Sequence, residues 1–129
     1  MKVIDSSALI KYIAKEENWE KVEEHLKEGC VTLDLAIIET ANALVKKALK
    51  NEVTTETAKE IINYLPKIVR ITPQKEHFSK ALEIATKHKL TIYDALFIAL
   101  SANTNTPLLT SDEKQAKTSK EYGVTVTLL

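Results

Sequence analysis

Several residue types are scarce in this chain of 129 residues, and each scarcity excludes a class of structure. The single cysteine, Cys30, cannot form an internal disulfide, and no N-terminal segment resembles a secretion signal, so we expect a reducing, cytoplasmic environment. Neither of the two glycines, Gly29 and Gly123, begins a phosphate-cradling loop, which excludes P-loop and dinucleotide-binding sites. No segment approaches the roughly 20 apolar residues that cross a bilayer, so we expect no membrane partner.

The composition predicts one globular domain. Hydrophobic residues make up 44% of the sequence, and the chain is too short for two ordinary cores, so residues 1–129 are expected to form a single domain. Eighteen Lys and Arg balance eighteen Asp and Glu, which is not the basic excess typical of nucleic-acid binders. If four of the acids held a cation, eighteen positive charges would face only fourteen negative ones, enough for modest attraction to phosphate.

Apolar runs alternate with amphipathic stretches along the whole chain. The segments predicted to be strands are residues 2–4, 30–33, 68–71, 107–109 and 124–128. The segments predicted to be helices are residues 6–15, 18–28, 35–50 (with Asp34 as its N-cap), 57–65 (opened by Thr54 and Thr55, ended by Pro66), 74–88, 91–102 and 113–121. Strands separated by helices require crossover connections, so the expected fold is α/β, a three-layer α/β/α sandwich around a mainly parallel sheet.

Aspartate is rare, and three of its four positions lie at the ends of apolar segments or within them. Asp5 ends the apolar run 1–4, Asp94 interrupts the apolar stretch 92–100, and Asp112 follows the strand segment 107–109 closely. In parallel α/β sheets, ligands lie beyond the carboxyl ends of the strands. Asp5 and Asp112 are expected at that edge.

Each of these acids also has a plain structural interpretation. Asp5 precedes a helix and could cap it, and Asp112 has the spacing of a capping box with Gln115. Asp94 could form a local capping pair with Thr91, although its helix is apolar on nearly all sides and is therefore expected to be buried.

Glu39 is the least distinctive acid taken alone. On a helical wheel it shares a stripe with Asn42, Lys46 and Lys50, which is typical of a solvated face. The opposite face is expected to be core and consists of Ile37, Ile38, Ala41, Leu44, Val45 and Ala48.

Four acids from separate elements could converge at one sheet edge. Two carboxylates about 5 Å apart repel by ~3 kcal/mol at an effective dielectric near 20, so such a cluster binds protons or a cation. Oxygen ligands alone favour Mg²⁺ or Mn²⁺ over zinc. His25, His77 and His88 share no ligand spacing and are expected at the surface or the core boundary.

At these residues the chain resembles PIN-domain ribonucleases, particularly the small VapC-type toxins of toxin–antitoxin pairs. The resemblance covers nearly the whole length, through the segments 3–9, 37–44, 90–95 and 108–112, which carry Asp5, Glu39, Asp94 and Asp112. It implies a metal-dependent endoribonuclease in which these four acids are catalytic and bind Mg²⁺ or Mn²⁺, with 5′-phosphate and 3′-hydroxyl products. It also implies a homodimer and an antitoxin partner.

Contacts with an RNA substrate are less defined by the sequence. Ser6 and Thr110 stand beside the acids and could orient water or a phosphate oxygen, but turn and capping roles are equally open. The only arginine, Arg70, lies in a predicted strand, so RNA contacts are expected from lysines such as Lys46, with Asn42 on the same stripe.

One other function and one surface remain open. A catalytically inert PIN-like RNA-binding or scaffold domain is the main alternative, whereas a receiver domain or a haloacid-dehalogenase-like phosphatase would need a second acid beside Asp5. One apolar set could serve a partner but is more typical of core, namely Trp19, Val22, Ile61, Ile62 and Leu65.

Overall fold

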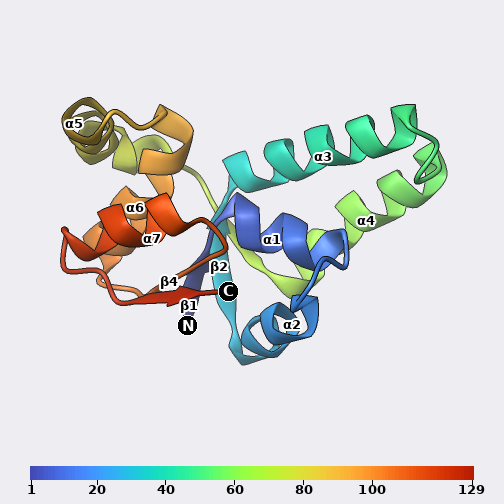
Figure 1. The fold of residues 1–129 in the computed structure, drawn as a ribbon, viewed down its shortest axis with the longest axis horizontal. Helices are drawn as coiled ribbons and strands as arrows, with labels where there is room; N and C mark the ends of the chain where they lie inside the picture. Colours follow the sequence, from blue (N-terminus) through green and yellow to red (C-terminus); the bar gives the residue numbers. More distant parts are fainter.

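The computed structural model describes all 129 residues and contains one five-stranded sheet (Figure 1). The strands are β1 (Lys2–Ile4), β2 (Cys30–Leu33), β3 (Arg70–Thr72), β4 (Leu108–Thr110) and β5 (Val126–Leu128). All neighbouring strands pair in parallel, in the order β3-β2-β1-β4-β5. Strands β2 and β3 therefore lie on one side of β1, and β4 and β5 lie on the other.

Helices cover both faces of the sheet. They are α1 (Ser6–Ile13), α2 (Trp19–Glu28), α3 (Asp34–Leu49), α4 (Thr55–Ile68), α5 (Phe78–His88), α6 (Ile92–Thr104) and α7 (Glu113–Lys120), with a short 3₁₀ helix, η1 (Lys75–His77). Figure 1 shows α1 to α4 on one side of the sheet and α5 to α7 on the other, with the α3–α4 pair projecting outward as an arm. This is the three-layer α/β/α arrangement that the sequence predicts.

The core lies between the sheet and the helices packed on its two faces. Its cluster of 23 buried residues includes Val3 and Ile4 of β1 and Leu108 and Leu109 of β4. Helix α6 is buried continuously from Ala95 to Ser101, as expected from its apolar sequence. None of the helices is both long enough and apolar enough to cross a membrane.

Several predicted element ends are wrong by a few residues. Helix α4 passes through Pro66 and ends at Ile68, because packing of Leu65 and Ile68 on the core outweighs the single backbone donor that proline lacks. Strand β3 consequently starts at Arg70, two residues later than predicted. The segment 74–88 divides into η1 and α5, β4 is shifted to 108–110, and β5 is shorter than predicted.

Asp34 does not cap α3. The cap position is Leu33, and Asp34 is the exposed first residue of the helix, because the chain turns directly from the buried end of β2 into α3. The Leu35 backbone N–H bonds instead to the side-chain Oε1 of Gln74, at 3.3 Å.

The predicted core face of α3 is wrong in part: Leu44 is buried and Ile37 packs on the core, but two of the predicted residues face solvent. Ile38 is 64% exposed and Val45 is 53% exposed, because α3 projects past the sheet and packs on α1 and α4. Its buried residues are Leu35, Ala36, Thr40 and Leu44. Of the apolar set that could serve a partner, Val22 and Leu65 are core, whereas Trp19, Ile61 and Ile62 are partly exposed.

Candidate active site

The site begins at the carboxyl end of β1, where the order of strands switches direction. Strand β1 lies between β2 and β4, so the edge beyond β1 and β4 is the position at which doubly wound sheets bind ligands. Asp5 directly follows β1 and is 3% exposed. Its Oδ1 accepts hydrogen bonds from the Ala8 backbone N–H at 3.1 Å and from Ser7 Oγ at 2.7 Å. Asp5 therefore caps α1 and still lies at the switch point.

Strand β4 brings the second part of the site against Asp5. Thr110, the last residue of β4, is fully buried, and its hydroxyl donates to Asp5 Oδ2. The same Thr110 Oγ1 accepts from the backbone N–H of Asp112 at 3.1 Å. Asp112 is exposed and caps α7, because its Oδ1 accepts from the Gln115 N–H at 2.8 Å. One threonine hydroxyl thus links the Asp5 side chain to the Asp112 backbone.

Glu39 turns toward the site and is not part of a purely solvated stripe. It lies in the second turn of α3 and is partly buried, and its Oε1 accepts from Ser6 Oγ at 2.6 Å. Ser6 is the first residue of α1 and is 8% exposed. Because α1 packs on α3, the start of α1 brings two acids together: Asp5 is its N-cap, and Ser6 in its first turn contacts Glu39.

Asp94 enters from the opposite side of the sheet. It lies in the first turn of α6, and its backbone N–H donates to Thr91 Oγ1 at 3.2 Å, so Thr91 is the cap as expected. The expectation that Asp94 is buried with its helix is wrong. The residue is exposed, because the first turn of α6 extends beyond the core and burial begins at Ala95.

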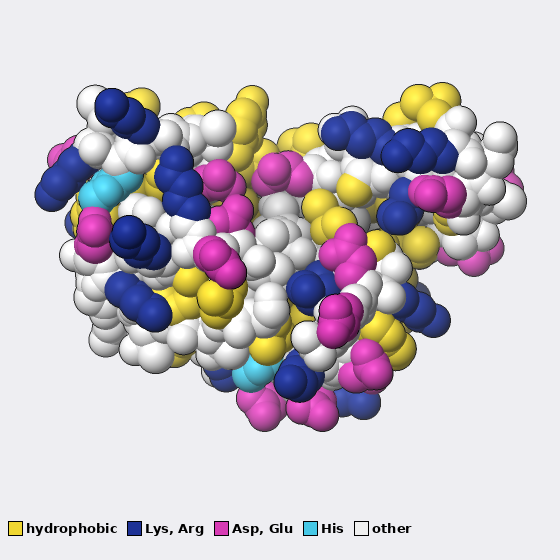
Figure 2. All heavy atoms as spheres, in the orientation of Figure 1, with side chains coloured by type: hydrophobic (Ala, Val, Ile, Leu, Met, Phe, Trp, Pro, Cys, Tyr) yellow, Lys and Arg dark blue, Asp and Glu magenta, His cyan; other side chains and the backbone are white.

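The predicted substrate residues divide into two pairs. Ser6 and Thr110 are buried and hold Glu39 and Asp5, whereas Asn42 and Lys46 are exposed on α3. Asn42 and Lys46 follow Glu39 by three and seven residues, so they lie on the same helix face. Figure 2 shows acidic side chains gathered in the hollow between the α5–α6 side and the α3–α4 arm, with basic side chains on the flanks.

The carboxylates of the site interact electrostatically. Burial raises the pKa of Asp5 to about 6, although Thr110, Ser7 and the Ala8 N–H oppose the shift, and the charge on Asp94 adds to it. Partial burial also raises the pKa of Glu39, and Asp94 raises it further. Asp94 is exposed, but part of the water around its carboxylate is displaced, and this desolvation raises its pKa. The negative charge on Asp112 raises the pKa of Asp94 further. Asp94 is therefore the acid through which the four are coupled.

The only basic side chain that acts on this group is Lys114, whose charge lowers the pKa of Asp94 without offsetting the effects of burial and of Asp112. None of the four acids forms a salt bridge. No three His, Cys, Asp or Glu side chains are arranged as a ready-made metal site. The donor set nevertheless suits a hard divalent cation, because it consists of carboxylate oxygens that repel one another and form no salt bridge. The exposed Asp94 and Asp112 have room to move toward such an ion.

The histidines lie outside this group. His25 and His88 are partly exposed, as predicted for boundary residues. His77 is 7% exposed and hence buried, which the sequence did not predict. It is enclosed because η1 packs on α6, where Asn103 Nδ2 lies 2.9 Å from His77 Nδ1.

Two residues of the site, Ser7 and Gln115, were not predicted from the sequence. Ser7 Oγ donates to Asp5 Oδ1, lies 3.2 Å from Thr110 Oγ1 and accepts from the Ser111 N–H at 2.9 Å. Gln115 is 2% exposed and its Nε2 donates to the backbone oxygen of Asp94 at 2.8 Å. The position of Gln115 three residues after Asp112 was visible, but only as a capping box.

Comparisons with known proteins identify the family of this chain. Residues 2–121 match the family model of the PIN domain. Ribonuclease VapC3 of Pyrobaculum aerophilum is 32% identical over 120 residues, which cover 89% of this chain and 92% of the relative.

Two solved structures share the fold. The crystal structure of PAE2754 from Pyrobaculum aerophilum superposes with a TM-score of 0.74 at 23% identity, covering 97% of this chain and 89% of the other. A toxin–antitoxin complex from Klebsiella pneumoniae gives a TM-score of 0.63 at 12% identity, covering 90% of each chain. With the acids at the switch point and the match over residues 2–121, this chain belongs to the PIN-domain family.

Proposed function

We propose that this protein is a metal-dependent endoribonuclease, the toxin of a toxin–antitoxin pair. The observation that carries the proposal is the set of four neighbouring carboxylates at the β1/β4 switch point, none of which forms a salt bridge. A relative 32% identical over most of the chain is named a ribonuclease, which supports RNA as the substrate.

The acids are proposed to hold Mg²⁺ or Mn²⁺. Asp5, Asp94 and Asp112 would hold the ion and Glu39 would complete the site. When bound, such an ion offsets the charge of the phosphodiester and makes water more acidic. The chain's own contribution is orientation: Thr110 and Ser7 fix both oxygens of Asp5.

Helix α1 and the helix caps orient the other three acids, Glu39, Asp94 and Asp112. Ser6 fixes one oxygen of Glu39, at 2.6 Å. The caps at Thr91 and Asp112 set where α6 and α7 begin, and therefore where Asp94 and Asp112 stand.

RNA is proposed to pass along the exposed face of α3. Asn42 and Lys46 extend from Glu39 along one helix face, and neither side chain forms a hydrogen bond or salt bridge within the chain. If Lys46 contacts phosphate, Lys46→Ala weakens RNA binding and reduces the slope of log affinity against log salt by about 1. A fluorescence anisotropy titration with labelled RNA, repeated across salt concentrations, measures the RNA affinity and its salt dependence.

The test of the function is cleavage of defined RNAs by the purified protein. Cleavage should require Mg²⁺ or Mn²⁺, stop in EDTA and leave 5′-phosphate ends. Asp94→Asn should lower it by at least about 100-fold, because losing even an outer-sphere contact of a metal site costs up to about that much. An inert RNA-binding or scaffold domain would bind these RNAs without cutting them, and that result would replace the proposed function with the alternative.

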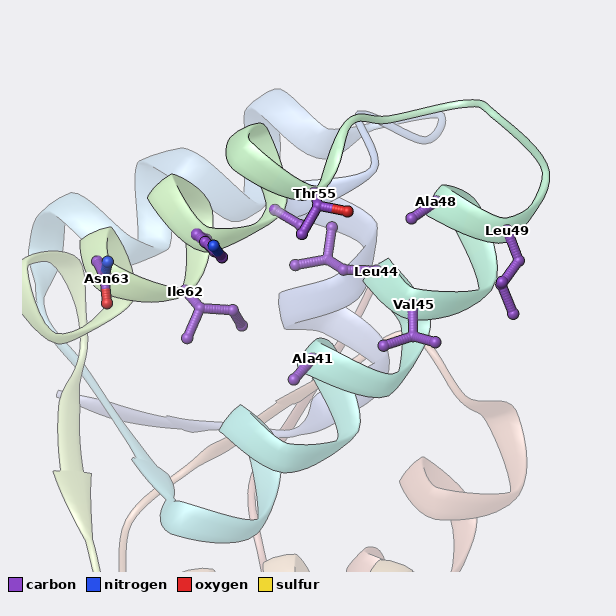
Figure 3. A pocket seen from close by; sticks show the side chains of 10 residues that line it. Ala41, Leu44, Val45, Ala48, Leu49, Thr55, Ile62 and Asn63 are labelled. Atoms are coloured by element: carbon purple, nitrogen blue, oxygen red, sulfur yellow. The ribbon is translucent and has the colours of Figure 1, made fainter.

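An antitoxin is proposed to cover the apolar hollow between α3 and α4. The hollow has a volume of about 540 Å³, and its apolar lining includes Ala41, Leu44, Val45, Ala48, Leu49 and Ile62. Figure 3 shows the side chains that line the hollow on the two helices, with Leu49 at its outer edge pointing away from α4. Val45 and Leu49 are more than half exposed, so a partner would remove apolar surface from water. A solved structure with this fold is a toxin–antitoxin complex, which supports a protein partner.

Two lysines suggest the charge of that partner. Lys59 lines the hollow, where it also pairs with Glu56 at 3.3 Å, and Lys46 is exposed on the same helix as Val45, so an apolar segment flanked by acidic residues is the best fit. Co-expression with the product of the adjacent gene tests this. Val45→Asp should abolish co-purification, whereas Tyr64→Asp, exposed on α4 outside the hollow, should not. Equal capture by both variants would place the partner elsewhere.

A homodimer in the cytoplasm completes the proposal. Helices α3 and α5 carry exposed apolar side chains, including Ile38 (64%), Phe78 (42%) and Leu82 (58%), that a second copy would cover. Light scattering should give twice the 14.5 kDa chain mass. Leu82→Asp should return it to one chain mass, and an unchanged mass would exclude this face.

A further inference from the structure

We propose that Gln115 is a positioning residue, which holds the first turn of α6, with Asp94, against the start of α7, with Asp112. The side-chain Nε2 of Gln115 donates to the backbone oxygen of Asp94, and its backbone N–H donates to Asp112 Oδ1, both at 2.8 Å. A single residue thus contacts two of the four acids. This role rests on the proposed function, since it concerns the same metal site.

The need for such a link follows from the charges. Asp94 and Asp112 are both negative, neither has a salt bridge, and they sit on different helices, so repulsion favours their separation. A lysine or arginine could hold the two helices together, but its charge would compete with a cation for the carboxylates. The neutral amide of Gln115 supplies a donor and leaves the negative charge intact.

The surroundings of Gln115 indicate that this donor is the reason for its burial. The side chain is 2% exposed, yet its Oε1 is buried without a partner. A buried acceptor without a donor is unfavourable, so a side chain chosen only to fill space would be apolar. The Nε2 bond to Asp94 is the one side-chain contact that an apolar residue of the same length could not make.

Helix α7 offers a matched control. Ser119 is fully buried, and its Oγ donates to the backbone oxygen of Gln115 at 2.7 Å. Ser119→Ala therefore removes a buried hydrogen bond at the same residue without touching α6. Gln115→Met keeps the side-chain length and removes only the donor and the unpartnered acceptor. Gln115→Asn keeps an amide but is too short by one methylene, and serves as a second variant.

The test is Mn²⁺ binding to the full chain without RNA, measured by isothermal titration calorimetry, with urea unfolding measured in parallel. Gln115→Met and Gln115→Asn should raise the Mn²⁺ dissociation constant by about tenfold or more, and Ser119→Ala by less than about twofold. The Mn²⁺ concentration that half-saturates RNA cleavage should move by the same factor. A merely structural role would instead lower stability in all three variants and leave Mn²⁺ affinity unchanged.

The outcomes separate this inference from the function itself. If the unmodified chain binds Mn²⁺ and cleaves RNA while Gln115→Met binds Mn²⁺ equally well, the positioning role is overturned and the function stands. If neither Gln115 variant folds while Ser119→Ala does, Gln115 is structural and the role is overturned. If the unmodified chain binds Mn²⁺ but cuts no RNA, the function fails and the positioning role is still decided by the variants. A chain that binds no Mn²⁺ overturns both.

Discussion

Replacing Asp5 with asparagine should stabilise the protein at neutral pH when no divalent cation is present. Burial raises the pKa of Asp5 from its ordinary value of 3.8 to about 6. Because each pH unit corresponds to about 1.4 kcal/mol, keeping Asp5 ionised costs the folded state about 3 kcal/mol at pH 7.5. Asp5→Asn removes this cost but also weakens one of the bonds from Thr110 and Ser7, at about 1 kcal/mol. The expected net gain is about 2 kcal/mol.

The sign of the pH dependence follows from proton binding. Between pH 3.8 and about 6 the folded protein holds the Asp5 proton more tightly than the unfolded chain does, so the contribution of Asp5 to stability is full below this window and lost above it. At pH 4 the Asp5→Asn variant should therefore be no more stable than the unmodified chain. The comparison between the two proteins cancels the titration of acids distant from the site.

The assay is urea unfolding followed by circular dichroism, in EDTA, at pH 4 and pH 7.5. Adding Mn²⁺ at pH 7.5 should reverse the order, since a ligand at 100 times its dissociation constant stabilises by about 2.7 kcal/mol and Asp5→Asn removes one of the carboxylates proposed to hold the ion. If Asp5→Asn lowers the free energy of unfolding equally at both pH values, Asp5 carries no ionisation cost and the reasoning is refuted.

Two further perturbations test the neighbours of Asp5. Thr110→Val leaves Asp5 Oδ2 and the Asp112 N–H without the hydroxyl that they share. It should lower the free energy of unfolding in urea by about 1–3 kcal/mol and the Mn²⁺ affinity measured by calorimetry by at least about tenfold. Thr110→Ser keeps the hydroxyl and should retain most of the stability and of the Mn²⁺ affinity. Glu39→Gln keeps an acceptor for Ser6 but loses a charge, and should lower RNA cleavage by about tenfold or more. Asp34→Asn, at an exposed position outside the site, should change stability by less than about 0.5 kcal/mol and leave cleavage intact; a loss equal to that of Glu39→Gln would contradict the assignment.

The layered fold could be predicted because its signals are local. Alternating apolar and amphipathic segments identify strands and helices, and strands joined by helices must pair in parallel. The predicted ends were less accurate where packing opposed a local preference. Helix α4 continues through Pro66 because Leu65 and Ile68 bury apolar surface, and β3 starts later as a result.

The candidate site was predictable to the extent that strand ends and rare residues mark it. Asp5 follows β1 directly and Asp112 follows the last residue of β4 by two positions, and β1 and β4 pair in register from Val3 with Leu108. Exposure was less predictable. Asp94 is exposed although its helix is buried, since a helical wheel gives the apolar faces of a helix but not where along its length the core ends.

The sequence by itself determined the α/β layering and the acids at the strand ends, because hydrophobic period and strand position are properties of the chain. Only the tertiary structure decided that Glu39 turns toward Ser6, that Ile38 and Val45 face outward, and that Gln115 joins Asp94 to Asp112. Each of these depends on which helix packs beside which, and contacts between residues tens of positions apart leave no periodic signal in a single sequence.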